Sequence, residues 1–142
     1  MVLSNELLFI AAEKSALAEA VGGFAREVMV LALNEPNAKT NREFLAKVLL
    51  AANLNLEQDA LLAEIPANEP RSLAPDLNQR QPKQVLVFGL SPIQLGLSFE
   101  VQAYQPMPFY GSIWLFADSL SALESDKTKK TQLWSALKQM FL

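Results

Sequence analysis

The sequence predicts an α/β fold of three layers, in which helices cover both faces of a mostly parallel four-stranded sheet. A short, continuous apolar run, which is typical of a strand buried on both faces, occurs at 28–33, and further mostly apolar runs that predict strands occur at 60–65, 85–90 and 112–116. Amphipathic segments at helical spacing alternate with these runs. The length of 142 residues fits one domain, with an N-terminal helix over 1–22 and the α/β core over 26–142.

The helices of the N-terminal half follow from apolar spacing and capping residues. A helix is predicted over residues 3–21, because leucine and alanine recur at helical spacing and two glycines follow its end. A turn at 34–37 ends the first strand, and Thr40 or Asn41 is expected to cap the next helix. The buried stripe of that helix is expected to contain Phe44, Leu45, Val48, Leu49 and Ala52.

The C-terminal half contains a long connection, an aromatic loop and a terminal helix. Residues 66–84 are polar and proline-rich, with a short helix predicted at 71–79. Ser91 and Pro92 are expected to start a short helix after the third strand. The stretch 98–111, which includes Phe99, reads as a structured loop without a strand, and a last helix is predicted over 126–141.

The composition excludes several classes of chemistry. The chain has neither cysteine nor histidine, so disulfides, thiolate nucleophiles, iron–sulfur clusters and histidine-based acid–base or metal chemistry are excluded. Any reaction would have to use Asp, Glu, Lys, Ser, Asn or Tyr, and the sequence predicts neither a cofactor nor a metal ion. A formal charge of -3 and a pI near 5.0 argue against a general electrostatic grip on nucleic acid.

The N-terminal stretch bears on the compartment of the protein. Charged residues such as Glu6, Glu13 and Lys14 interrupt its apolar run, so we expect neither a signal peptide nor a membrane-spanning helix. The expected compartment is therefore the cytoplasm. Hydrophobic residues make up 51% of the sequence, and a surface rich in them would also suit a homodimer.

Polar residues follow the predicted strands where the sheet would end. In parallel sheets ligands bind beyond the carboxyl ends of the strands, so these residues are candidates for a common pocket. The alternative is a purely structural role, because turns use Asn, Asp, Ser and Pro for backbone reasons. The candidate pocket residues are Asn34, Glu35, Asn37, Ser91, Asp118 and Ser119.

Two further surfaces are candidates for binding a partner. Aromatic residues held between prolines at Tyr104, Phe109 and Tyr110 would suit a protein interface, or would simply cover one edge of the sheet. The terminal helix carries a basic patch that would hold phosphate, or would be a solvated face with Trp134 in the core. The patch consists of Lys127, Lys129, Lys130 and Lys138.

The order of these elements resembles that of the uracil-DNA glycosylase superfamily over about residues 26–141. The resemblance rests on a strand followed by Asn-Glu-Pro at 34–36, a strand ending in Phe-Gly at 88–89, and Phe-Ala-Asp-Ser-Leu at 116–120 before a lysine-rich helix with Trp134. It implies a three-layer α/β/α fold. In that superfamily the first of these positions holds the residue that orients the attacking water, and the last holds the loop that stabilises the leaving base.

The catalytic motifs of the superfamily are degraded in this chain. Asn34 or Glu35 would stand for the water-positioning residue, but the glycines of that motif are missing. Where many members have His-Pro-Ser or Asn-Pro-Ser, this chain has Ala117, Asp118 and Ser119. The chain is also similar in length and in its Trp-bearing final helix to a non-enzymatic branch, the psi subunit of the bacterial DNA polymerase III clamp loader, which is a small adaptor that binds another small subunit.

Two functional hypotheses follow. The first is a non-catalytic protein-interaction module with a degenerate glycosylase-like fold, possessing a protein partner and serving replication as a psi-like adaptor. The second is a divergent DNA-binding protein or glycosylase-like enzyme, which requires the strand-end residues to converge in one cleft beside a basic surface. The acidic pI and the negative charge of Asp118 favour the first.

Overall fold

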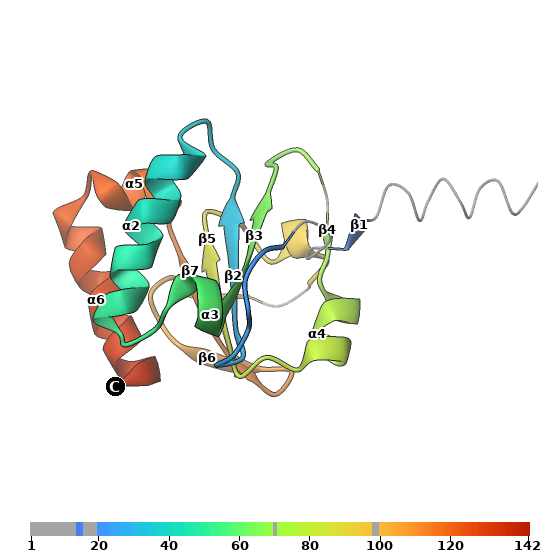
Figure 1. The fold of residues 1–142 in the computed structure, drawn as a ribbon. Coiled ribbons are helices and arrows are strands. Elements are labelled where there is room, and N and C mark those ends of the chain that lie inside the picture. The colour runs from blue at the N-terminus through green and yellow to red at the C-terminus, as the bar shows by residue number, and fades with distance from the viewer. Residues whose placement is uncertain (1–13, 16–19, 70, 98–99) are drawn as a thin grey trace, which may run out of the picture.

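The computed structural model describes residues 14–15, 20–69, 71–97 and 100–142. At its centre lies a five-stranded sheet with the order β3-β2-β5-β7-β6, and helices cover both of its faces (Figure 1). The prediction of an α/β fold with a mostly parallel sheet is confirmed, and all four predicted strands are present. The strand number was wrong, because the sheet has a fifth, antiparallel strand at one edge.

Four parallel strands form the body of the sheet, and the fifth pairs with the last of them. The four pair in register, with Leu31 beside both Ala63 and Val87, and Val87 beside Phe116. The strands are β2 (Val28–Leu33), β3 (Ala60–Ile65), β5 (Gln84–Phe88) and β7 (Ser112–Ala117), with β6 (Met107–Phe109) antiparallel to β7. The first two match the predicted bounds, because a six-residue run that is wholly apolar, as in β2, or apolar except for Glu64, as in β3, suits a strand with both faces covered.

Side chains alternate between two cores because successive strand residues point to opposite faces. Val28 and Val30 of β2 pack beneath the larger helical layer, whereas Met29 and Leu31 face the smaller one. The larger layer consists of α2 (Ala38–Ala51), α3 (Leu56–Asp59), α5 (Leu120–Glu124) and α6 (Lys127–Phe141). The smaller layer consists of α4 (Ala74–Arg80) and the short 3-10 helix η1 (Ile93–Leu95). No helix in the described ranges is long and apolar enough to span a membrane.

The N-terminal part differs from its prediction where the structure describes it. Most of the predicted helix over 3–21 lies outside the described residues. Its described part includes β1 (Lys14–Ser15), a short strand parallel to β4 (Arg71–Ser72), so these residues are not helical. Val21 exchanges two backbone hydrogen bonds with Leu62 of β3, at 2.9 and 2.8 Å, and thereby covers part of that sheet edge.

Several helices and strands begin or end at other residues than predicted, because tertiary contacts outweigh the local capping and turn signals. Helix α2 begins at Ala38, before the expected caps, and Asn41 lies buried inside it. Ser91 does not cap a helix, since η1 starts after Pro92. The stretch 98–111 contains β6 as well as a loop, and its Phe99 lies outside the described residues. The predicted helix at 71–79 is α4, shifted by a few residues, and α5 was not predicted.

Candidate functional site

A polar network lies at the carboxyl end of β2, where the sequence predicted a pocket. Asn41 Nδ2 donates to Glu35 Oε1 at 3.3 Å, and Asn37 Nδ2 donates to Asn41 Oδ1 at 3.2 Å. Ser121 of α5 donates its hydroxyl to Asn37 Oδ1 at 3.1 Å and its backbone N–H to Glu35 Oε1 at 3.4 Å. These bonds join the loop after β2 to the first turns of α2 and α5.

The network is structural, because its polar groups are directed at one another. Asn41 is only 1% exposed, so its amide depends on these partners to offset the loss of water. Asn41 and Ser121 were missed in the sequence, although an asparagine one turn after a strand-ending loop is a signal that could have pointed to them. Glu35 and Asn37 therefore belong to one network, in which their hydrogen bonds connect the loop after β2 to α2 and α5.

Asp118 and Ser119 are also engaged in holding neighbouring elements. Asp118 accepts a hydrogen bond from the Tyr104 hydroxyl and lies 3.4 Å from Lys129 Nζ of α6. Ser119 is the N-cap of α5, and its hydroxyl accepts the backbone N–H of Ala122 at 3.3 Å. Both residues thus fix the start of the C-terminal helices.

Ser91 and Asn34 do not join either group through any hydrogen bond found in the described residues. Ser91 donates its hydroxyl to Gln94 Oε1 at 3.2 Å, and Gln94 Nε2 donates to the carbonyl of Ala67 after β3. The backbone N–H of Asn34 donates to the carbonyl of Ile65 at 2.8 Å, and its side chain is exposed. The six predicted pocket residues are thus divided among separate contacts, and none of them lines any of the three hollows found in the described part of the chain.

The hydroxyl of Tyr104 is predicted to ionise at unusually high pH. Burial, followed by its hydrogen bond to Asp118, raises the pKa of Tyr104 from 10.0 to about 12. Because the folded state holds this proton more tightly, the resulting stability is complete below pH 10 and is lost as the pH rises towards 12. Absorbance at 295 nm in a Tyr110→Phe variant, which leaves one of the two tyrosines, should show this titration.

A matched change separates the hydrogen bond from the burial. Replacing Asp118 with asparagine in the same Tyr110→Phe background should bring the pKa of Tyr104 down, because the carboxylate raises it by both charge and hydrogen bonding. An unchanged titration after that replacement would mean that Asp118 does not hold the tyrosine proton.

The three predicted aromatic residues do not form one surface. Tyr104 is half-buried and packs with the core beneath α2 and α6, whereas Phe109 packs with the core on the opposite face of the sheet. Tyr110 is 65% exposed at the tip of the β6–β7 hairpin. The loop therefore supports the sheet edge at Tyr104 and Phe109 and presents one exposed ring.

The basic patch on α6 is partly used in intramolecular contacts. Lys129 pairs with Asp118, and the ammonium groups of Lys130 and Lys138 lie 5.6 and 5.8 Å from the ring centres of Phe44 and Trp134. Trp134 is half-buried against the core. Lys127 is exposed at the first turn of α6. Cation–π contacts of this kind hold lysine chains along the helix without removing their charge.

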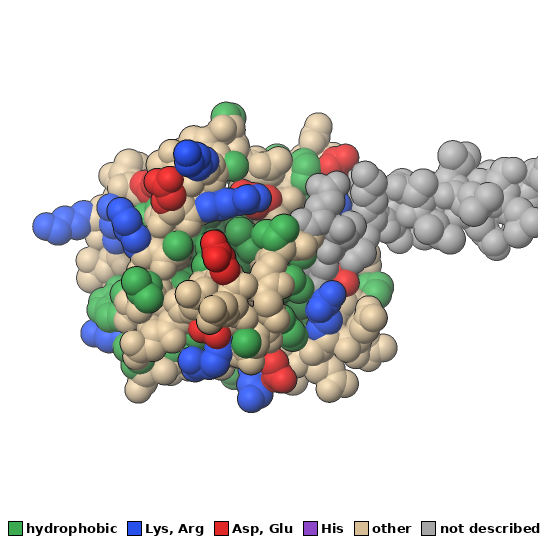
Figure 2. All heavy atoms as spheres, viewed as in Figure 1, with side chains coloured by type: hydrophobic (Ala, Val, Ile, Leu, Met, Phe, Trp, Pro, Cys, Tyr) green, Lys and Arg blue, Asp and Glu red, His purple; other side chains and the backbone are tan. Residues whose placement is uncertain are grey.

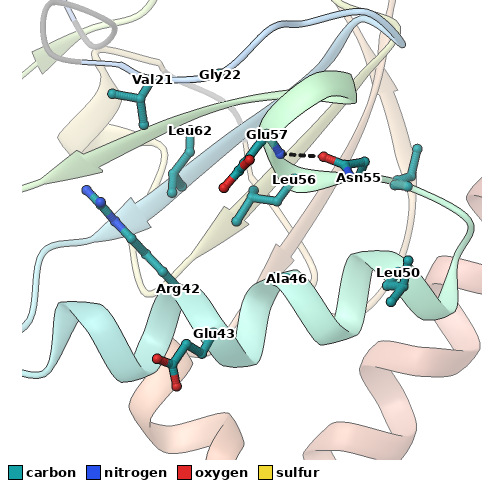
Figure 3. A pocket seen from close by; sticks show the side chains of 11 residues that line it. Val21, Gly22, Arg42, Glu43, Ala46, Leu50, Asn55, Leu56, Glu57 and Leu62 are labelled. Atoms are coloured by element: carbon teal, nitrogen blue, oxygen red, sulfur yellow. Dashed lines mark hydrogen bonds between the residues drawn. The ribbon is translucent and has the colours of Figure 1, made fainter.

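An open hollow with a largely apolar lining lies between α2 and the α3–β3 edge, with a volume of ≈ 800 Å³ (Figure 3). Apolar side chains reach the surface near the centre of this face, between acidic and basic ones (Figure 2). We call this hollow the α2–β3 groove, and its apolar lining consists of Val21, Ala46, Leu50, Leu54, Leu56 and Leu62. Leu50 and Val21 are 67% and 53% exposed, which is unusual for large apolar side chains that flank one hollow.

The groove has polar groups at its margins but no catalytic arrangement. Arg42 donates Nε to Glu64 Oε1 at 3.0 Å and also binds it through a second nitrogen, so their charges offset one another. Asn55 Oδ1 accepts the backbone N–H groups of Glu57 and Gln58 and caps α3. No group of acidic residues in the described ranges is arranged to hold a metal ion. The groove is suited to binding rather than to chemistry.

Sequence reasoning missed the α2–β3 groove because three separate segments build it. One signal was available in α2, where Leu50 lies outside the buried row that contains Leu45 and Leu49. A large apolar residue outside the core stripe of an amphipathic helix is a candidate for contact with another molecule.

Two comparisons with known proteins found no relative of this chain. No protein-family model matches the chain, and no curated protein is significantly similar to it in sequence. The resemblance to the uracil-DNA glycosylase superfamily stays a prediction from the order of elements, and function has to be inferred from the sites themselves.

Proposed function

We propose that this chain is a non-catalytic protein-interaction module, a degenerate glycosylase-like fold that serves as a small adaptor in the cytoplasm, similar to the psi subunit of the bacterial clamp loader. The observation that carries the proposal is the engagement of the strand-end polar residues. Glu35 and Asn37 make hydrogen bonds to residues of α2 and α5. Ser119 caps α5, and Asp118 forms an ion pair with Lys129 of α6. None of these four residues lines a hollow found in the described part of the chain, so they are not placed to meet a substrate.

The α2–β3 groove supports the same proposal from the side of binding. Exposed Leu50 and Val21 flank an apolar hollow that borders an edge of the sheet. Interfaces are commonly built from apolar centres with polar margins, and the polar lining of this groove includes Arg42 and Asn55. A protein partner would bury the apolar side chains that water now covers.

Co-expression with the other small clamp-loader subunit and the loader ATPase subunits of the same genome tests the proposal. We expect a stoichiometric complex in size-exclusion chromatography with light scattering, and the same measurement on the chain alone determines whether it forms a homodimer. Absence of any complex with these subunits would overturn the clamp-loader assignment.

The rival function, a divergent DNA-binding protein or glycosylase, has its own measurement. Fluorescence anisotropy with single-stranded and uracil-containing duplex DNA, together with an assay of base release, should show neither salt-sensitive binding nor release. Binding that weakens with salt, accompanied by base release, would favour the enzyme and would make Asn34 and Glu35 the first residues to replace.

A further inference from the structure

The wall of the α2–β3 groove on α2 has the shape of a helix-packing surface. Arg42, Ala46 and Leu50 follow one another at four-residue spacing, so they form one ridge along the helix. The neighbouring row, which includes Leu45 and Leu49, is buried on the sheet. Ala46 is small and lies between two long side chains, which leaves a notch that one apolar side chain of another helix would fill.

The opposite wall offers side chains rather than free backbone. Leu62, the β3 residue that lines the groove, has both its N–H and its carbonyl bonded to Val21, at 2.8 and 2.9 Å. An added strand would therefore find this point of the sheet edge occupied. Leu56 projects towards Ala46 across the groove (Figure 3). The groove thus suits a helix that inserts side chains, and not a strand that extends the sheet.

The charge of the groove favours a cation near its middle. Glu57 points its carboxylate into the space between α3 and α2, whereas Glu43 points away from that space (Figure 3). No ion pair or side-chain hydrogen bond found among the described residues engages the carboxylate of Glu57, while the charge of Arg42 is offset by Glu64. A ligand that places an ammonium or guanidinium group beside Glu57 would complement this charge.

We propose that the α2–β3 groove binds an amphipathic helix of a partner protein, which places an apolar side chain against Ala46 and a Lys or Arg against Glu57. This inference rests on the proposed interaction function and specifies the surface and the partner chemistry. The helix would cover Leu50 and Val21, which are the two exposed apolar residues at the margins of the groove.

Two synthetic helical peptides of the same leucine spacing test the proposal, one with lysine and one with glutamate beside the apolar stripe. In titrations followed by amide NMR of the full chain, the lysine peptide should shift the amides of Ala46, Leu56 and Glu57. Its Kd should be about three- to fivefold lower than that of the glutamate peptide, which is the range of a single exposed ion pair.

Matched variants separate this site from the general attraction of an acidic protein for a cationic peptide. Glu57→Gln should abolish the preference for lysine, whereas Glu100→Gln, an equal charge change at an exposed residue that does not line the groove, should keep it. Ala46→Leu should weaken the binding of both peptides, because the larger side chain fills the notch. An unchanged melting temperature of this variant would show that its fold is intact.

The outcomes distinguish this proposal from the clamp-loader assignment. If neither peptide shifts the groove amides at a peptide concentration of about 1 mM, the Kd is too high for useful recognition. That result would overturn the proposed helix site. So would an equal response of the Glu57→Gln and Glu100→Gln variants. If a peptide binds in the groove but no complex with clamp-loader subunits forms, the helix site is supported. The partner protein would then act in a process other than clamp loading.

Discussion

Replacing Trp114 with alanine is expected to lower the free energy of unfolding by about 3–5 kcal/mol, the usual cost of removing a buried aromatic side chain. Trp114 is 0% exposed in β7, next to the edge strand. Its ring stacks on that of Phe116 with centres 6.0 Å apart, and its Nε1 donates to the carbonyl of Phe109 at 2.9 Å. The substitution would leave a cavity and would also remove a bond that holds β6 on the sheet.

Thermal and urea unfolding followed by circular dichroism measure this effect. A loss of this size should lower the melting temperature by about 10–15 °C in a domain of this length. The neighbouring residue Ile113 is 38% exposed, so Ile113→Ala should cost less than about 1 kcal/mol. Equal losses in the two variants would show that Trp114 is not the packing centre of this face.

Replacing Gly89 with alanine is expected to have the second largest effect. Gly89 has a φ of 75°, in the left-handed region, and follows β5 where the polypeptide approaches β7 and the loop after it. A Cβ at this position would lie 2.9 Å from both Cα and Cβ of Ser119 and 3.1 Å from Cβ of Leu33. Backbone strain alone costs about 1–3 kcal/mol, and the backbone of Ser119 cannot yield without moving the start of α5.

Gly111 provides the matched control for Gly89. It has nearly the same φ, 76°, but a Cβ there would have no atom within 4 Å. Gly111→Ala should therefore show the cost of the backbone conformation alone, about 1–3 kcal/mol. Urea unfolding of both variants gives the comparison, and a Gly89→Ala loss no larger than that of Gly111→Ala would contradict the close packing against Ser119.

The strands were predictable because buried strands are rich in apolar residues. The run 28–33 is apolar throughout and the run 60–65 is apolar except for Glu64, and a strand covered by helices on both faces needs such a run. Strand β6 was missed because Pro108 lies within it and because three residues carry too little periodicity to be recognised. Its presence depends on pairing with β7, which is a non-local contact.

The hydrogen-bond partners of the strand-end residues could not be predicted from local sequence. Parallel strands bring their carboxyl ends to one edge, so the proximity of Glu35 and Asn37 to α5 follows from topology. Their partners Asn41 and Ser121 lie in helices whose starting points were not foreseen, since Asn41 was expected to cap α2 rather than to be buried in it. Whether a polar residue is available for binding depends on such partners.

The α/β class, the positions of the four parallel strands and the exclusion of cysteine and histidine chemistry follow from the sequence alone, because composition, apolar runs and helical spacing are local properties. The packing of the helices on the sheet determines that the predicted pocket residues are divided among separate hydrogen-bonded contacts, and that a groove lies between α2 and β3. Hydrogen-bond partners such as Asn37 and Ser121 are 84 residues apart in the chain, and their pairing follows from how the helices pack on the sheet.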